Sequence, residues 1–353
     1  MSYVESVISN YDMGATPHAD SAFRVPRWLA SPHVQTLGAA LPLHAPLGFK
    51  PREATAERIV VPTEAGVGLA AHAWWHSGDV ARRLAVVVHG VGGSANSRYV
   101  IRAARALFSA GHHVVRLNLR GAGDGANDAT SMYHAGLSHD LRAVVGALAE
   151  LPKVCELVVV GFSLGGNVAL KAAGEWGENA PSKLRGVASI SAPLDLAAVS
   201  KSLERLQAWP YHKWIVEGLI VQARAFAAAH PTHARFDPRA LRGIRTVYEY
   251  DERVVAPMHG FPSANEYYAR ASSGPYLADI RVPTLLIHAE DDPLVPMSTV
   301  RAPLARLGST SAARSVRTRI TPHGGHVGWY ASLDEDGLVN NWPMRQVMSF
   351  FAN

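Results

Sequence analysis

The stretch from Leu157 to Lys171 constrains the fold of this chain more than any other part of the sequence. It opens with four apolar, mostly β-branched residues, a pattern that predicts a buried parallel strand. The run rich in Ala and Leu that follows Gly166 predicts a helix. Ser163 therefore lies on a turn that takes the chain from a strand into a helix within a few residues.

Gly161 and Gly165 flank Ser163 in a Gly-x-Ser-x-Gly pattern, and this spacing has a steric reason. So abrupt a turn forces the serine into a strained backbone conformation, and side chains at the two glycine positions would collide with neighbouring backbone. This is the arrangement of a nucleophile elbow, which projects the serine hydroxyl above the carboxyl ends of the strands. The pattern alone should occur in about one in ten random chains of this length, so its strength comes from the flanking strand and helix.

Predicted strands and helices alternate on both sides of this stretch. A β-hairpin is expected over residues 57–76. Further strands are expected at 84–88, 113–119, 186–191, 284–289 and 317–320, and helices at 97–110, 137–151, 297–307 and 341–350. This rhythm predicts an α/β fold with a mostly parallel central sheet that is flanked by helices on both faces.

Residues 197–281 interrupt the alternation with many aromatic side chains and with helical patterning near 198–229. We expect a cap insertion over the strand ends; the alternative is a set of ordinary crossover helices with no lid role. Residues 1–56 are rich in Pro, His and Ala and show little periodicity, which predicts an irregular N-terminal arm packed on the core. The core itself then comprises residues 57–196 and 282–353.

The composition narrows the class of protein further. The chain has 353 residues, 48% of them hydrophobic, but its apolar runs are far shorter than the roughly twenty residues of a membrane span. No leader pattern is visible at the N-terminus, so we expect no integral membrane segment.

The single cysteine, Cys155, allows no intrachain disulfide, and it is expected to be buried; a reducing cytoplasm is the simplest location. The net charge of +5 is scattered, which argues against nucleic acid and leaves weak attraction to anionic lipid as a minor alternative.

A serine needs a base within hydrogen-bond reach to become a nucleophile, and the base needs an acid to orient it. After an elbow of this kind the acid follows the serine in the chain and the histidine comes last. The strand expected to end at Ala289 is followed by Glu290, Asp291 and Asp292. We prefer Asp292 as the acid, because its spacing to Val295-Pro296 suits an acid loop, and Asp291 remains the alternative. Whichever of the two is not the acid is expected to stabilise the turn or cap a helix.

The predicted base is His326, which follows two glycines that we expect to give it a flexible loop near the strand ends. His323 is the next candidate. A zinc site at these two histidines is the other interpretation, but two histidines three residues apart with no nearby cysteine form a weak metal signature. No metal or cofactor is therefore expected.

Acyl transfer also needs backbone N–H groups directed at the developing oxyanion. One is the amide of Leu164, at the N-terminus of the helix after the serine. The other is expected in the glycine-rich loop after His89-Gly90, at the amide of Val91. A phosphate-binding loop is excluded here, because the loop lacks both Gly-Lys-Ser/Thr and a spaced Gly-x-Gly-x-x-Gly.

With these residues assembled, the chain resembles the α/β-hydrolase superfamily, and within it the branch of YheT-like bacterial hydrolases and ABHD-type eukaryotic lipases (AB hydrolase 4). The likeness runs over nearly the whole length. It rests on Pro26-x-Trp28-Leu29, His33-x-Gln35-Thr36, His89-Gly90 with Gly93-Ser94 and Tyr99, Asn118-x-Arg120-Gly121, residues 161–167, residues 191–196, Gly260-Phe261, Glu266-Tyr267-Tyr268, Asp291-Asp292-Pro293 and residues 323–328.

The resemblance implies a serine hydrolase of carboxylic esters, a carboxylesterase or lipase-like enzyme, with Ser163, Asp292 and His326 as its catalytic triad. The expected substrate is a small-molecule ester with an apolar acyl chain, held under the aromatic cap. Two alternatives remain: an acyltransferase that passes the acyl group to an alcohol, and a non-catalytic binding module of the same fold. The motif from His33 to Thr36 has no chemical role that the sequence explains, and the oligomeric state is left open.

Overall fold

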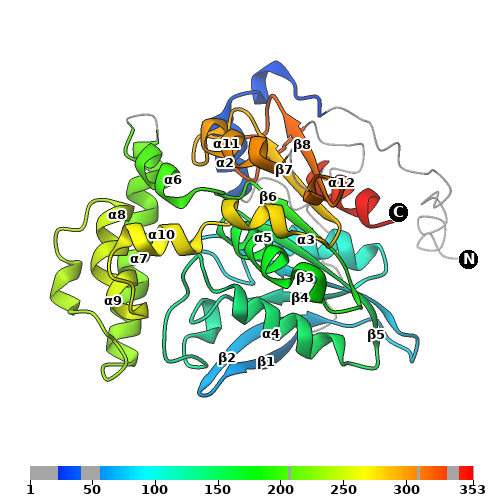
Figure 1. The fold of residues 1–353 in the computed structure, drawn as a ribbon, viewed down its shortest axis with the longest axis horizontal. Coiled ribbons are helices and arrows are strands. Elements are labelled where there is room, and N and C mark those ends of the chain that lie inside the picture. Colours follow the sequence, from blue (N-terminus) through cyan, green and yellow to red (C-terminus); the bar gives the residue numbers. More distant parts are fainter. Residues whose placement is uncertain (1–22, 41–55, 206–207, 308–310, 332–341, 353) are drawn as a thin grey trace, which may run out of the picture.

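The computed structural model describes residues 23–40, 56–205, 208–307, 311–331 and 342–352. Its centre is an eight-stranded sheet with the strand order β1-β2-β4-β3-β5-β6-β7-β8 (Figure 1). The strands are β1 (Glu57–Glu64), β2 (Val67–Trp74), β3 (Arg82–Val88), β4 (His113–Leu117), β5 (Val154–Phe162), β6 (Leu184–Ile190), β7 (Thr284–Ala289) and β8 (Val316–Thr321). β1 and β2 form the expected antiparallel hairpin, β2 runs antiparallel to β4, and the other neighbouring strands pair in parallel. The predicted α/β fold is confirmed.

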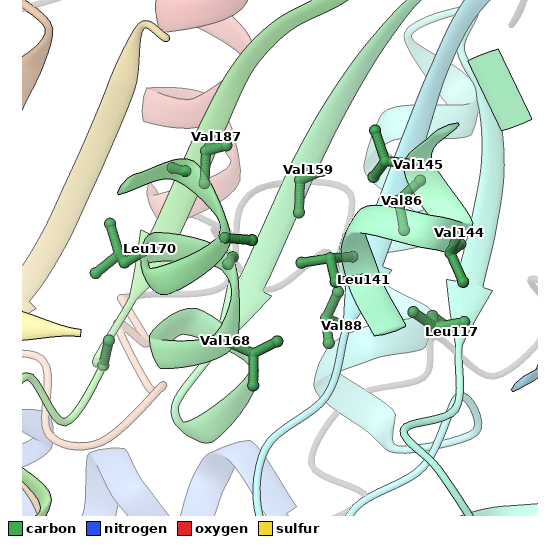
Figure 2. Close-up of a cluster of buried hydrophobic side chains, with 14 of the residues drawn as sticks. Val86, Val88, Leu117, Leu141, Val144, Val145, Val159, Val168, Leu170 and Val187 are labelled. Atoms are coloured by element: carbon green, nitrogen blue, oxygen red, sulfur yellow. The ribbon is translucent and has the colours of Figure 1, made fainter. Parts of the chain in front are cut away.

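The sheet is covered on both faces, because its central strands carry apolar side chains on both. One face packs against α4 (Ser138–Ala149), α5 (Leu164–Trp176) and α11 (Met297–Leu307), and the other against α3 (Arg98–Ser109) and α12 (Trp342–Ala352). Figure 2 shows the first face, where Val86, Val88 and Val159 of the strands lie against Leu141 of α4 and Val168 of α5. Short turns η2 (Gly123–Gly125), η3 (Gly177–Asn179) and η7 (Ser311–Arg314) complete this part of the chain.

Residues 197–281, which we call the cap, hold a separate group of helices. The helices from α7 to α10 lie together on one side of the sheet in Figure 1 and share an apolar cluster, whereas α6 and η6 contribute side chains to the main core. The elements are α6 (Leu196–Leu203), α7 (Trp209–Ala229), η4 (Pro238–Leu241), α8 (Val247–Tyr250), the π-helical turn η5 (Asp251–Val255), α9 (Ala256–His259), α10 (Ala264–Ala271) and η6 (Gly274–Asp279). Among the described residues, no helix has both the length and the apolar character needed to cross a membrane.

Two local expectations are wrong. The arm is not irregular throughout, because it forms the turn η1 (Arg27–Leu29) and the helix α2 (Pro32–Ala40); the expectation for residues 1–22 and 41–55 lies outside the described residues. Cys155 is exposed rather than buried. The register between β3 and β5 shifts at this point, where Arg82 faces Val154 and Arg83 faces Glu156. Cys155 is therefore the extra residue of a bulge and leaves the core.

Candidate active site

Ser163 lies at the turn between β5 and α5, with φ 51° and ψ −121°, a conformation that a residue with a side chain rarely adopts. A Cβ atom at Gly161 would lie 2.4 Å from the carbonyl oxygen of Gly165, and one at Gly165 would lie 2.4 Å from that of His89. Both distances are far inside van der Waals contact. The structure therefore shows the steric reason for both glycines, and it shows the strained serine that the spacing predicts.

The three residues predicted as a triad come together in a single chain of hydrogen bonds. His326 Nε2 lies 3.0 Å from Ser163 Oγ, and His326 Nδ1 lies 2.8 Å from Asp292 Oδ2. An ionised carboxylate only accepts hydrogen bonds, so Nδ1 carries the proton when Asp292 is charged. Nε2 is then the free acceptor, and the serine hydroxyl can donate to it.

Asp292 is held in its charged form by its surroundings. Burial alone would raise the pKa of its carboxyl, but His326 and the backbone amides around it outweigh burial and keep the pKa below its ordinary value. The amides of Leu294 and Val295 both donate to Oδ1 at 2.9 Å. One oxygen is thus fixed by its own loop, and the other orients the imidazole.

The neighbouring acid, Asp291, points to a different partner. Its Oδ1 accepts a hydrogen bond from the amide of Gly325 at 2.9 Å, and its Oδ2 lies 3.2 Å from His323 Nδ1. Of the two candidates, the structure places Asp292 on His326 and leaves Asp291 to hold the loop that carries His326. His323 and His326 face different carboxylates, which is not the convergence of side chains that a zinc site needs.

Val91 and Leu164, whose backbone amides are the expected oxyanion donors, line the same cavity as Ser163 and His326. Neither amide donates to an acceptor within the part of the chain that the structure describes. The amides on either side of Val91 are used: Gly90 donates to the hydroxyl of Tyr99 at 2.9 Å, and Gly92 to that of Tyr133 at 2.7 Å. The loop is thereby fixed while the amide of Val91 stays available.

His89 is a further residue of this loop, and its role is not visible in the sequence. It is fully buried, donates from Nδ1 to the carbonyl of Gly90 at 2.7 Å and accepts at Nε2 from the amide of Leu119 at 3.0 Å. Burial lowers its pKa to about 4, against the smaller effect of the Gly90 carbonyl. The imidazole is therefore neutral near pH 7 and ties the loop after β3 to the end of β4.

The arm contacts the loop of His326 directly, which explains the motif from His33 to Thr36. The Gln35 side chain is completely buried; it accepts from the amide of Tyr330 at 2.6 Å and donates to the carbonyls of Tyr330 and Leu29, each at 2.8 Å. Thr36 Oγ1 accepts from the amide of His326 itself at 2.9 Å. The motif is visible in the sequence, but its role is not, because its partners lie about three hundred residues away in the chain.

Gly324 and Gly325, the two glycines that we expected to give His326 a flexible loop, have another role in the structure: they allow close packing. Gly325 has φ +55°, and a Cβ there would lie 2.6 Å from the carbonyl oxygen of Pro32. A Cβ at Gly324 would lie 2.6 Å from the Trp329 ring. The glycines therefore let α2 and the indole approach the loop, which is fixed by contacts on both sides.

A cavity of about 120 Å³ lies between the triad and the cap. Ser163 and His326 border it, and the cap contributes half of the residues that line it. Its apolar lining includes Leu196, Val199, Leu203, Ile215, Leu219 and Val255, and its polar lining includes Ser200, Gln222, Tyr250, Asp251, Tyr267 and Tyr268. Of the aromatic residues expected there, Tyr250, Tyr267 and Tyr268 line the cavity, whereas Trp209 and Trp214 are exposed on α7.

The topology, the serine turn and the acid–histidine order define a class of protein. A sequence profile of the alpha/beta hydrolase fold matches residues 86–330, well over half of the chain. This chain belongs to the α/β-hydrolase family.

The relatives of the chain define the branch more narrowly. It is 31% identical over 244 residues to the protein YheT of Escherichia coli (strain K12), an alignment that covers 69% of each chain. It is 28% identical over 270 residues to the monoacylglycerol lipase of Saccharomyces cerevisiae, covering 71% of this chain and only 56% of the lipase. It is also 28% identical over 291 residues to the yeast medium-chain fatty acid ethyl ester synthase/esterase 2, covering 76% and 62% of the two chains. The chain is an α/β hydrolase of the YheT/ABHD type, as the sequence motifs indicated.

Solved structures agree on the fold. The esterase Pf2001 of Pyrococcus furiosus superimposes with a TM-score of 0.51 at 18% identity, over 77% of this chain and 84% of its own. The 2,6-dihydroxy-pseudo-oxynicotine hydrolase superimposes with a TM-score of 0.56 at 17% identity, over 84% and 67%. At such identities the likeness concerns the fold alone.

Proposed function

We propose that this chain is a serine hydrolase of carboxylic esters, which acts through an acyl-enzyme on Ser163. The observation that carries the proposal is the hydrogen-bonded chain of Ser163, His326 and Asp292 at the wall of a largely apolar cavity. A monoacylglycerol lipase and an ester synthase/esterase among the relatives support ester chemistry for the branch. We keep the cytoplasm as the proposed location, because a single cysteine allows no intrachain disulfide.

Each step of the proposed reaction has a group in place. The Ser163 hydroxyl attacks the ester carbonyl while His326 Nε2 takes its proton, and Asp292 stabilises the resulting imidazolium through Nδ1. The amides of Val91 and Leu164 bind the oxyanion, and one such donor is worth on the order of 10²–10³ in kcat. His326 returns the proton to the leaving alcohol, and water then releases the acyl group by the same steps.

The test is hydrolysis of p-nitrophenyl esters from acetyl to palmitoyl by the wild type and by Ser163→Ala. Loss of the nucleophile should lower kcat by on the order of 10⁴ or more without unfolding the chain. Ser109→Ala, an exposed serine at the end of α3, is the matched control and should keep full activity. Retention of activity by Ser163→Ala would overturn the proposal. The optimum chain length in the wild type would measure the depth of the cavity.

Acyl transfer to an alcohol is the second candidate, because one relative is named as a synthase as well as an esterase. The acyl-enzyme would be the same, and an alcohol would replace water in the second half of the reaction. Adding ethanol and measuring ethyl ester against free acid separates the two activities. Serine-dependent ester formation that exceeds hydrolysis would establish a transferase.

A further inference from the structure

One acid in the cap is placed inside the substrate cavity rather than on the surface. Asp251 is the first residue of the π-helical turn η5; it is only 7% exposed and lines the same cavity as Ser163. Single π-helical turns of this kind occur frequently at functional sites. The triad does not use Asp251, and the proposed hydrolysis does not require it.

Only one of the two oxygens of Asp251 is occupied. Oδ2 accepts a hydrogen bond from the hydroxyl of Tyr268 at 2.6 Å. The hydroxyl oxygen of Tyr268 also lies 3.1 Å from Ser200 Oγ, within hydrogen-bond distance. Among the described residues, Oδ1 has no hydrogen-bond partner, and no cationic side chain forms an ion pair with the carboxyl. Tyr250 also lines the cavity, and its hydroxyl is likewise without a partner in the described part of the chain.

Holding Tyr268 in place would explain one oxygen of Asp251 but not the other. Oδ1 is not one of the fully buried polar atoms without a partner, so it is open to the cavity, where solvent can reach it. A ligand that fills the cavity displaces this solvent and leaves Oδ1 unpaired unless the ligand brings a polar group of its own. The free oxygen therefore indicates a polar group on whatever occupies the cavity.

We propose that Asp251, supported by Tyr268 and Ser200, forms a binding site for a hydroxyl group carried by the part of the ester that enters the cavity. The inference rests on the proposed hydrolase function and names a substrate class for it: hydroxyl-bearing esters. Tyr250 offers a second polar group beside the same site.

The protonation state of the carboxyl favours a hydroxyl over other polar groups. Burial raises the pKa of Asp251 to about 7, against the opposing effect of the Tyr268 hydrogen bond, so both protonation states are populated near neutral pH. A hydroxyl donates to the carboxylate and accepts from the acid, and it therefore suits both states. An ammonium group only donates, and a carbonyl group only accepts.

The test compares neutral probes that differ by one hydroxyl: straight-chain 1-alkanols and the α,ω-alkanediols of the same length, from four to ten carbons. Binding is measured by calorimetry on the Ser163→Ala protein, so the result does not depend on turnover. At the length that reaches Asp251, the diol should bind about tenfold tighter than the alkanol, the effect of about one hydrogen bond. Equal binding of diol and alkanol at every length would overturn the site.

Variants then assign the preference to Asp251. Asp251→Leu should abolish the diol preference, whereas Asp251→Asn, which keeps a polar side chain, should retain most of it. Glu217→Leu is the control: it also replaces an acid by leucine, but on the exposed side of α7, and it should leave the diol preference unchanged. An unchanged preference in Asp251→Leu would refute the assignment, and tighter binding of ω-amino alcohols than of diols would replace the hydroxyl site with a cation site. If the chain hydrolyses no ester but still prefers diols, the proposed function fails while the binding site stands.

Discussion

The arm and the cap both reach the active site from outside the sheet, but they contact it in different ways. Helix α2 of the arm binds the backbone of the loop that carries His326, through the side chains of Gln35 and Thr36. The cap instead presents side chains, both apolar and polar, to the cavity beside Ser163. We propose that this difference separates two tasks: the arm positions the base for any substrate, and the cap selects which substrate fits.

The two regions also touch each other. His33 Nδ1 of α2 lies 2.9 Å from the hydroxyl of Tyr211 on α7, and the two rings are stacked. If the tasks are separate, changes in the arm should lower the turnover of all esters alike, whereas changes in the cap should alter the preference between esters.

The largest effect is expected for Gln35→Leu. This change leaves the two buried backbone groups of Tyr330 and the part-buried carbonyl of Leu29 without the partner that Gln35 supplies, which should destabilise the chain by several kcal/mol. The released loop displaces His326, and we expect kcat to fall by about 10²-fold. Steady-state kinetics on acetyl and octanoyl esters, together with urea unfolding, measure both effects. A loss that depends strongly on chain length would break the division between arm and cap.

The cap should make stability depend on pH through Asp251, whereas Gln35 and Thr36 carry no titrating group. The pKa of Asp251 is about 7 in the folded chain, above its ordinary value of 3.8, so the folded state keeps a proton that the unfolded state releases between these values. The contribution of Asp251 to the free energy of unfolding is therefore highest below about pH 4 and falls by up to a few kcal/mol as the pH rises to about 7. Asp251→Asn should lack this contribution. Urea unfolding of the wild type and of Asp251→Asn at several pH values measures this contribution. If the free energy of unfolding depends on pH equally in both proteins, the prediction is contradicted.

Leu219 tests the selective role of the cap. It lies on α7 and lines the cavity, so Leu219→Phe should shorten the space available to an acyl chain. We expect kcat/KM for octanoyl esters to fall about tenfold relative to acetyl esters. The ratio of the two esters is the readout, because a general loss of folded protein would lower both. A constant ratio would show that Leu219 does not limit the chain.

Thr36→Val should give the smallest effect. It removes the acceptor for the amide of His326 but keeps the shape of the side chain. We expect kcat to fall severalfold for every ester with little change in KM. Thr36→Ser retains the hydroxyl and should restore the wild-type value. Equal activity of the Val and Ser variants would show that the hydrogen bond does not position the base.

The fold was predictable because its signals are local. The apolar runs of β3, β5 and β7 and the turn at Ser163 each lie within about ten residues, where periodicity and glycine spacing report structure directly. Asp292 and His326 followed from their places after strands and from their order after the serine. The hydrogen bond between them could be seen only in the structure.

The support around the site was not predictable in the same way. Gln35 bonds to Tyr330, 295 residues away, and a side chain that binds a distant backbone leaves no periodic trace in the sequence. Asp251 is one of many acids in the chain, and only its place at the wall of the cavity, seen in the structure, distinguishes it. Gly325 was expected to loosen its loop, because sequence alone cannot tell a glycine needed for motion from one needed for close contact.

The distance along the chain between α2 and the loop of His326 also governs when the enzyme becomes active during synthesis. Residues 35 and 36 leave the ribosome first, whereas His326 and Tyr330 follow almost three hundred residues later. Ser163 and the cap are made in the interval, before the proposed base is present. Ser163 precedes His326 by 163 residues (326 − 163), so the proposed triad stays incomplete while that stretch is made, and it is held in place only once Tyr330 has followed.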